Sequence, residues 1–144
     1  MNAQQMWALY AEKEKITAEY DAWAFGDDPD ELARLVLLGE KTGTSSAYLW
    51  YDLEKEPLPK EGEYNVILNS AEEAVCITKT TRVYITPFNR VAEAHARKEG
   101  EGDKSLTYWR KVHEDFFTKE LEEAGLSFRD TMEIVCEEFV RVYP

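Results

Sequence analysis

The spacing of hydrophobic residues in the first third of the chain predicts two helices. Apolar side chains recur every three or four positions from Asn2 to about Trp23, among Glu, Lys and Gln, as on one face of an amphipathic helix. A second helix is predicted from Asp28, an expected N-cap, because a proline and two acidic residues follow it. Gly39 is expected to end this helix, since glycine readily adopts the left-handed conformation that reverses the chain.

The middle of the chain changes to the alternation that is typical of strands. Residues 44–51 carry two alternating sets of side chains, so we expect a strand with aromatic residues on both faces. The β-branched segments 64–68 and 75–85, separated by a polar turn, predict a β-hairpin. A last strand is expected at residues 132–143.

Two further helices are predicted between the hairpin and the last strand. A short one is expected to start at Asn89 and to close at the glycine-containing segment 99–103. A longer one, capped by Asp103 or Ser105, is expected to end at Gly125. Helices and strands thus mix without strict alternation, which predicts the α+β class.

The length and the hydrophobic content of the chain favour a single domain. Its 144 residues, 44% of them hydrophobic, supply enough apolar side chains for one core. We expect residues 1–26 to form a helical extension that packs on a domain made of residues 27–144.

The charge of the chain limits what it can bind. The 29 acidic residues outnumber the 17 basic ones, and the net charge of -12 repels a phosphate backbone. Binding of duplex DNA by a broad basic face is therefore not expected, whereas a pocket with one lysine and several donors could still accept a nucleotide. The longest aliphatic run, residues 35–38, is too short to cross a bilayer, and no secretory signal is recognisable. We expect a cytoplasmic protein without a membrane partner.

The cysteines and histidines do not form a recognisable metal-binding pattern. Cys76 and Cys136 lie singly in apolar stretches, which favours buried thiols over a zinc site or a disulfide framework. His95 and His113 lie on predicted helices among apolar neighbours, and two glycines and a helix cap separate them. We interpret both as structural histidines and predict no metal and no cofactor.

Two polar segments are candidates for a binding site. Lys41 and Thr44 follow the predicted helix end at Gly39, where backbone amides and short side chains can converge on a ligand. Alone, this segment is more typical of a helix-ending turn with a solvated lysine. The second candidate is Glu99, because its acidic neighbours at 101 and 103 are explained by the helix that follows, whereas Glu99 has no such role.

Taken together, three segments resemble the ASCH domain family. They are the pattern Gly39-x-Lys41-x-x-Thr44, the aromatic run 48–51, and the run 99–103 followed by Tyr108-Trp109. The resemblance covers roughly residues 32–143. It implies a PUA-like mixed β-barrel with flanking helices. It also implies single-stranded RNA, a nucleotide or a modified nucleoside as partner, since ribonuclease activity on single strands and deacetylation of N(4)-acetylcytidine are both attributed to the family.

The resemblance also implies a catalytic set. In the small amidohydrolase members this set is a lysine, a threonine and a glutamate, which match Lys41, Thr44 and Glu99. A threonine hydroxyl needs a base before it can act as a nucleophile, and a partly desolvated lysine can serve as that base. Glu99 could orient the leaving amine or move a proton, although an ion pair with Lys41 would hold the proton on the lysine.

Ser46 departs from the amidohydrolase pattern, in which an arginine stands two residues after the threonine. Serine cannot offer the planar fork of arginine to a phosphate or a carbonyl, so either the ligand differs or another cation such as Arg82 substitutes. Tyr48 and Trp50, predicted to share a strand face with Ser46, could stack on a base, and core packing is an equal alternative for both.

Gly39, Ser46, Tyr48, Trp50 and Arg82 are therefore the expected ligand-binding residues. Two functions stay open, namely a hydrolase that acts on RNA or a modified nucleoside and a non-catalytic RNA- or nucleotide-binding module. A third alternative is a protein-interaction domain that uses the acidic N-terminal helix.

Overall fold

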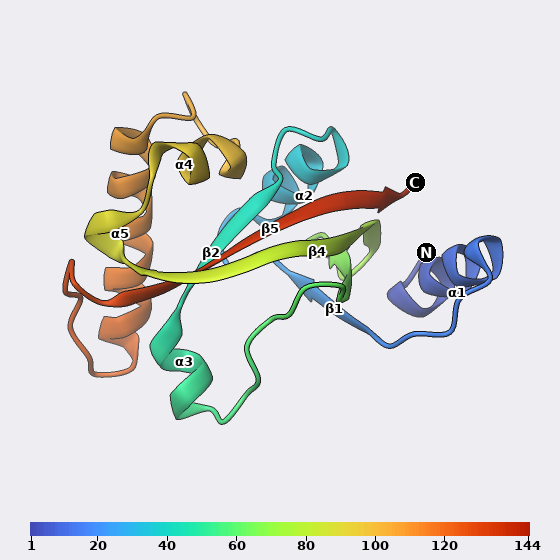
Figure 1. Cartoon of the computed structure of the whole chain (residues 1–144), viewed down its shortest axis with the longest axis horizontal. Coiled ribbons are helices and arrows are strands. Elements are labelled where there is room, and N and C mark those ends of the chain that lie inside the picture. The colour runs from blue at the N-terminus through green and yellow to red at the C-terminus, as the bar shows by residue number, and fades with distance from the viewer.

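The computed structural model describes all 144 residues as a mixed five-stranded sheet flanked by helices (Figure 1). The strand order is β1-β3-β4-β5-β2. The strands are β1 (Tyr20–Ala24), β2 (Gly43–Ala47), β3 (Tyr64–Leu68), β4 (Ala74–Pro87) and β5 (Glu133–Tyr143). The helices are α1 (Ala3–Glu14), α2 (Pro29–Leu37), α3 (Tyr48–Leu53), α4 (Glu93–Glu99) and α5 (Leu106–Glu123), with a 3-10 turn η1 (Phe88–Arg90). The predicted α+β class is confirmed.

The sheet curls into a half-barrel, so that its edge strands β1 and β2 line the same cavity. The predicted hairpin is confirmed as the antiparallel pair β3 and β4, and the predicted last strand as β5, which pairs with both β4 and β2. β1 adds to β3 in parallel. The long strands β4 and β5 thereby connect the two ends of the molecule.

Three apolar clusters join the helices to the sheet. The largest lies under α4 and α5, the second under α2, and the third under α1, where Met6, Trp7 and Tyr10 pack against Val66 and Ile77. Figure 1 shows α1 at one end of the molecule and α4 with α5 at the other. The two cysteines are free thiols within these clusters.

The prediction of one helix from Asn2 to Trp23 was wrong in its second half. α1 ends at Glu14 because Lys15 adopts the left-handed conformation, and Tyr20 to Ala24 then pair with β3. The aromatic residues at helical spacing belong to two elements, and backbone pairing with β3 overrides the apparent period. The proposed division of the chain at residue 26 stays a prediction. β1, which precedes this residue, and β3, which follows it, are neighbours in one sheet.

The prediction of a strand at residues 44–51 was also wrong in its second half. β2 ends at Ala47, which pairs with Ile134 near the start of β5. Beyond this point no neighbouring strand remains for an edge strand to pair with, and the chain turns into the short helix α3. Tyr48 and Trp50 therefore do not continue a strand face that begins with Ser46.

Some of the predicted helix ends are confirmed by the structure and others are not. Pro29 begins α2 and Gly39, with a φ of 79°, follows its last turn, as predicted. Asp28 forms no side-chain capping bond, and α4 begins at Glu93 rather than at Asn89. Ser105 caps α5 by accepting a hydrogen bond from the Tyr108 amide. None of the helices combines the length and the apolar character that a bilayer-spanning helix needs.

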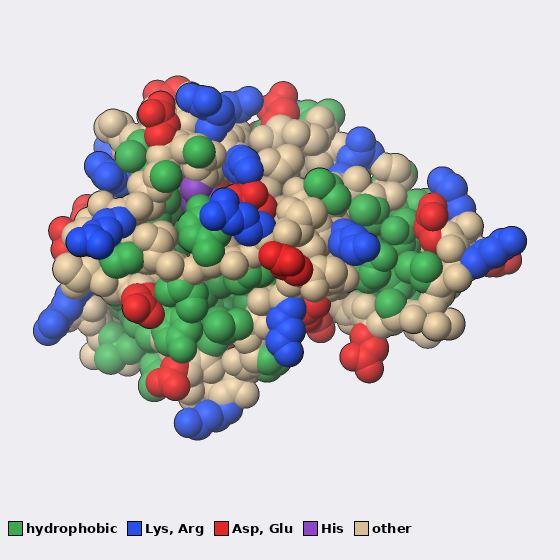
Figure 2. Space-filling model, viewed as in Figure 1, with side chains coloured by type: hydrophobic (Ala, Val, Ile, Leu, Met, Phe, Trp, Pro, Cys, Tyr) green, Lys and Arg blue, Asp and Glu red, His purple; other side chains and the backbone are tan.

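The surface does not display a continuous basic area on the face shown in Figure 2. Lysine and arginine side chains are interspersed there with acidic ones and with apolar areas. On this face, as over the whole chain with its net charge of -12, acidic groups would repel a phosphate backbone.

Candidate functional site

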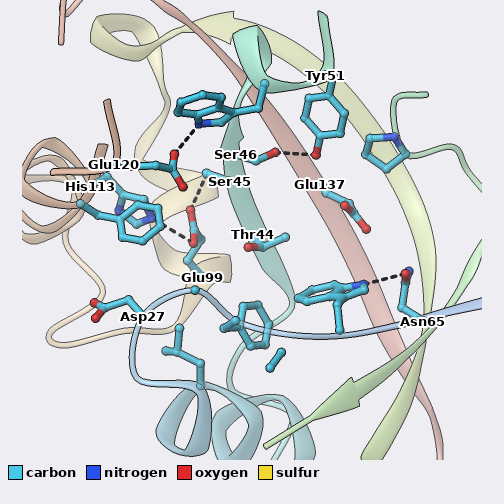
Figure 3. A pocket seen from close by; sticks show the side chains of 18 of the residues that line it. Asp27, Thr44, Ser45, Ser46, Tyr51, Asn65, Glu99, His113, Glu120 and Glu137 are labelled. Atoms are coloured by element: carbon cyan, nitrogen blue, oxygen red, sulfur yellow. Dashed lines mark hydrogen bonds and ion pairs between the residues drawn. The ribbon is translucent and has the colours of Figure 1, made fainter. Parts of the chain in front are cut away.

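A cavity of about 870 Å³ lies between the two edges of the curled sheet. β1 and β2 form its opposite margins, and residues from α5 and from the segment after α3 close its sides. Figure 3 shows its two ends, with Glu99 and His113 on one side of Thr44, and Glu137 and Tyr51 on the other. The volume is within the range of about 300–1,000 Å³ that small-molecule sites occupy.

Lys41 lines the cavity at the end that holds Glu99 and is almost completely buried. Its ammonium nitrogen is 3.2 Å from Glu99 Oε1 and 2.9 Å from Glu101 Oε2, and only 1% of its side chain is exposed. The backbone amide of Lys41 donates to the carbonyl of Leu35 in α2, and that of Thr42 donates to the carbonyl of Lys98 in α4. The turn after α2 therefore holds Lys41 against α4, and the alternative of a solvated lysine is excluded.

Gly100 allows the turn that carries Lys41 to lie close to the end of α4. It follows Glu99 with a φ of 71°, and a Cβ atom at this position would lie 2.1 Å from the carbonyl oxygen of Glu40. Only glycine combines this conformation with such a close backbone approach. The glycine thus fixes the distance between the Lys41 turn and the end of α4.

Glu99 is the centre of a buried polar network. Its Oε2 accepts hydrogen bonds from Ser45 Oγ at 2.6 Å and from Trp109 Nε1, and its Oε1 is 3.4 Å from His113 Nε2. Burial alone would raise the pKa of the Glu99 carboxyl, but the charge of Lys41 and then His113 outweigh burial and hold this pKa well below its ordinary value. The carboxylate is therefore ionised in this environment.

The two histidines complete the network around Glu99. His95 Nε2 lies 2.7 Å from Ser45 Oγ; because the serine donates to Glu99, the imidazole must donate to the serine oxygen. The other ring nitrogen, His95 Nδ1, is buried without a hydrogen-bond partner. Burial lowers the pKa of His113, but Glu99 and the Trp109 carbonyl outweigh it, so this pKa is raised above its ordinary value.

The opposite end of the cavity is polar without a cation. Thr44 on β2 pairs with Glu137 on β5 in the sheet register, which directs both side chains to one face. Thr80 Oγ1 donates to Glu137 Oε2 at 2.9 Å, and Asn65 Oδ1 accepts a hydrogen bond from Trp23 Nε1 at 2.8 Å. Burial raises the pKa of the Glu137 carboxyl, and nearby Glu63 raises it further against the lowering effect of the Thr80 hydrogen bond.

Comparison with known proteins identifies the family. The family model described as "ASCH domain" matches residues 21–143. The chain belongs to the ASCH domain family. Its fold is that of solved ASCH structures, a PUA-like fold, as the resemblance implied.

Two solved structures resemble this ASCH domain over nearly its whole length. An ASCH domain from Lactobacillus crispatus JV V101 has 35% sequence identity and a TM-score of 0.91, with 98% of this chain and 94% of that chain covered. A protein from Enterococcus faecalis V583 has 36% identity and a TM-score of 0.91, with 99% and 88% covered. A third structure, a hypothetical protein with 17% identity and a TM-score of 0.58 over 86% of this chain and 100% of that one, shares the fold alone. A search of curated proteins found no match.

Most of the predicted site residues of this ASCH domain meet in the cavity. Its lining includes Lys41, Thr44, Ser46, Trp50 and Glu99.

The other three predicted residues, Gly39, Tyr48 and Arg82, are not among those that line the cavity. Arg82 pairs with Glu138 at 3.3 Å and lies over the Tyr84 ring, with 60% of its side chain exposed. It is therefore not placed to substitute for the arginine that Ser46 replaces. Ser46 Oγ is instead hydrogen-bonded to Tyr51 Oη at 2.8 Å.

Sequence reasoning missed several residues of the site. The interpretation of His95 and His113 as structural histidines did not anticipate that both contact Glu99. Their spacing was informative, because His95 lies four residues before Glu99 and His113 four residues after Trp109, which places each pair on one helix face. The roles of Ser45 and Glu137 had no comparable signal, since both depend on which strands pair.

One cluster has the donor atoms of a metal site. Oxygen atoms of Glu99 and Glu101 and a nitrogen of His113 lie within 4.8 Å of one another. The Lys41 ammonium group contacts both carboxylates within 3.2 Å and already supplies a positive charge there. A metal ion bound to the same oxygens would therefore be repelled by Lys41.

Proposed function

We propose that this ASCH domain binds a modified nucleoside in the cavity and hydrolyses an amide bond on its base, as in N(4)-acetylcytidine. The observation that carries the proposal is the buried Lys41–Glu99 pair, which lines the same cavity of about 870 Å³ as Thr44. A charged pair that is costly to bury is typical of a site with a chemical role.

The charge of the cavity favours a nucleoside over a polyphosphate or an RNA backbone. Eight of the lining residues are acidic, and Lys41 is the one lysine or arginine among them. Phosphate groups inside this cavity would be repelled by most of its charges. An uncharged base and sugar would meet no such barrier.

Aromatic side chains of the cavity supply faces for a base. Trp23 lies on β1 and Trp50 on α3, while Phe116 projects from α5. Stacking on an aromatic ring contributes about 1–3 kcal/mol per base. The walls therefore provide affinity, whereas the polar groups at the two ends provide orientation.

The residues present can supply an acyl-transfer reaction. In the proposed first step, Thr44 Oγ1 attacks the acyl carbon; Lys41 takes up the proton of the hydroxyl group as it passes one of its own ammonium protons to the Glu99 carboxylate. The bond between the acyl carbon and the exocyclic nitrogen then breaks, and the same proton passes to that nitrogen. Water hydrolyses the threonine ester in a second step, which releases the acid and restores the hydroxyl group.

Release of acetate from N(4)-acetylcytidine by the purified protein tests this proposal. We expect turnover by the wild type and a loss of at least about a hundredfold in Lys41→Ala, Glu99→Gln and Thr44→Val. Lys98→Ala is the matched control, because this lysine pairs with Glu138 outside the cavity and should retain activity. Rates that are unchanged in all three site variants would contradict the catalytic assignment.

The second candidate is a non-catalytic module that holds the base of a nucleotide or of single-stranded RNA. It is favoured by Ser46, which stands where amidohydrolase members carry an arginine and is hydrogen-bonded to Tyr51. Titration with cytidine and with short single-stranded RNA decides between the two. Saturable binding that Lys41→Ala abolishes, without release of acetate and without cleavage of the RNA, would favour the module.

A further inference from the structure

We propose that Glu137 is a specificity-determining residue, which donates a hydrogen bond from its carboxyl group to an acceptor atom of the bound base. This inference rests on the proposed binding of a nucleoside. It assigns to Glu137 a role that differs from that of Glu99, although both are buried glutamates of the same cavity.

The position of Glu137 brings it next to the reacting end of a ligand. Glu137 lies on β5 directly opposite Thr44 on β2. Side chains of such cross-strand partners lie about 5 Å apart on the same face of the sheet. Figure 3 shows both labelled side chains inside the cavity, with Tyr51 above Glu137. A base whose substituent reaches Thr44 therefore presents its ring edge to Glu137.

The hydrogen bonds of Glu137 determine where a carboxyl proton would point. Thr80 Oγ1 donates to Oε2, so this oxygen acts as an acceptor within the protein. The other oxygen, Oε1, has no hydrogen bond within the protein and remains accessible to solvent. A proton on Oε1 is consequently available to a ligand and to no protein group.

The groups around Glu137 favour the protonated form. Glu63 faces it from the segment before β3 and Tyr51 from α3, whereas β4 contributes the uncharged Thr80 and β2 the uncharged Thr44. None of these neighbours is a cation. Burial and the charge of Glu63 accordingly raise the pKa of Glu137.

Asn65 offers a second donor in the same cavity. Its Oδ1 accepts the Trp23 indole hydrogen, which leaves the amide nitrogen with no hydrogen-bond partner in the protein. A base edge with adjacent acceptors matches these two donors. Cytosine has such an edge, because its O2 and N3 are both acceptors. Uracil carries a hydrogen on N3, so its N3–H donor would face a donor group of the protein.

Tryptophan-fluorescence titrations with cytidine and uridine test the role of Glu137. In the wild type we expect cytidine to bind more tightly than uridine, and its affinity to fall as pH rises through the raised pKa of Glu137. Glu137→Gln keeps an N–H donor at every pH, so its cytidine affinity should stay near the acidic wild-type value and lose this pH dependence. Glu137→Ala should bind cytidine about tenfold more weakly and discriminate less against uridine.

His113 also titrates and lines the cavity, so the pH profile is interpreted as the difference between wild type and Glu137→Gln. Glu138→Gln is the matched control, because it removes one glutamate charge at the next position, whose side chain pairs with Lys98 and Arg82. It should bind both nucleosides as the wild type does.

Two results overturn the inference. One is cytidine affinity in Glu137→Ala equal to that of the wild type; the other is a wild-type pH profile that coincides with that of Glu137→Gln. The second comparison stands even if the alanine variant fails to fold. If the wild type binds neither cytidine nor N(4)-acetylcytidine, the proposed function itself is contradicted, and the role of Glu137 with it. If the wild type binds cytidine but the Glu137 variants behave as the wild type does, only the role of Glu137 is contradicted.

Discussion

The two ends of the cavity each bury a glutamate, and their surroundings shift the pKa of that glutamate in opposite directions. At one end, Lys41 and His113 outweigh the burial of Glu99 and lower its pKa. At the other end, Glu137 meets Thr80 and the charge of Glu63, and its pKa is raised. Burial is similar, so the neighbouring charges decide the difference.

This comparison shows how one cavity can combine two chemical tasks. An ionised carboxylate can accept and move a proton, whereas a neutral one can donate a hydrogen bond to a ligand. We therefore call the end around Lys41 and Glu99 the charged end and the end around Glu137 and Asn65, which has no lysine or arginine, the cation-free end. Substitutions at the charged end, in the turn that supports it and at Ser46 separate these tasks.

Lys41→Met should damage the charged end most. The substitution leaves Glu99, with 2% of its side chain exposed, without its nearest positive charge. Loss of one partner of a buried ion pair costs about 3–5 kcal/mol, and we expect a decrease of that size in the free energy of unfolding measured with urea. Lys98→Met, which removes a half-exposed pair with Glu138, should cost no more than about 1 kcal/mol. Equal losses in both variants would contradict a structural role for the buried pair.

Gly100→Ala should separate the Lys41 turn from α4. The added Cβ would meet the Glu40 carbonyl at 2.1 Å in a backbone with positive φ. The matched variant is Gly39→Ala, where φ is 79° but no atom lies within 4 Å. Gly39→Ala should cost about 1–2 kcal/mol from the backbone conformation alone. Gly100→Ala should cost about 1–3 kcal/mol more, as measured by thermal and urea unfolding. Similar values for the two would indicate that the close approach is not required.

His113→Gln should reveal how much the imidazolium contributes to the charged end. The folded pKa of His113 is raised, so its contribution to stability is complete below its unfolded pKa and is lost as pH rises through the folded value. We expect the wild type to exceed the variant by about 1.5–3 kcal/mol in mildly acidic solution and by less in alkaline solution. The free energy of unfolding as a function of pH measures this difference. A constant or growing difference would contradict the pairing of His113 with Glu99.

Ser46→Ala should have the smallest effect, because the Ser46 side chain is hydrogen-bonded to Tyr51 and to neither glutamate. The change removes one hydrogen bond to Tyr51 and should reduce the free energy of unfolding by about 0.5–1.5 kcal/mol. Cytidine affinity should change less than threefold. A much larger loss of affinity would show that Ser46, rather than the two ends, determines binding.

The parts of the fold that local sequence determines could be predicted. Gly39 ends α2 as expected, and the β3–β4 hairpin and β5 follow from their β-branched residues. Residues 20–24 and 48–53 were misassigned, because their conformations depend on where a partner strand is present or absent. Such long-range pairing leaves no period in the local sequence.

The candidate site was predictable to a similar degree. Lys41, Thr44 and Glu99 followed from the family resemblance, and Lys41 and Glu99 are in contact. Ser45 could not be recognised, since its contact with His95 and Glu99 requires α4 to lie against β2. Glu137 required the register between β2 and β5, which only the three-dimensional structure provides.

A crystal structure of the protein with cytidine bound tests the central claim most directly. We expect electron density for the base between Trp23 and Trp50. Its exocyclic nitrogen should point toward Thr44 and Lys41, and its ring edge should lie within hydrogen-bond distance of Glu137. An empty cavity at saturating cytidine, or cytidine bound on another surface, would contradict the central claim.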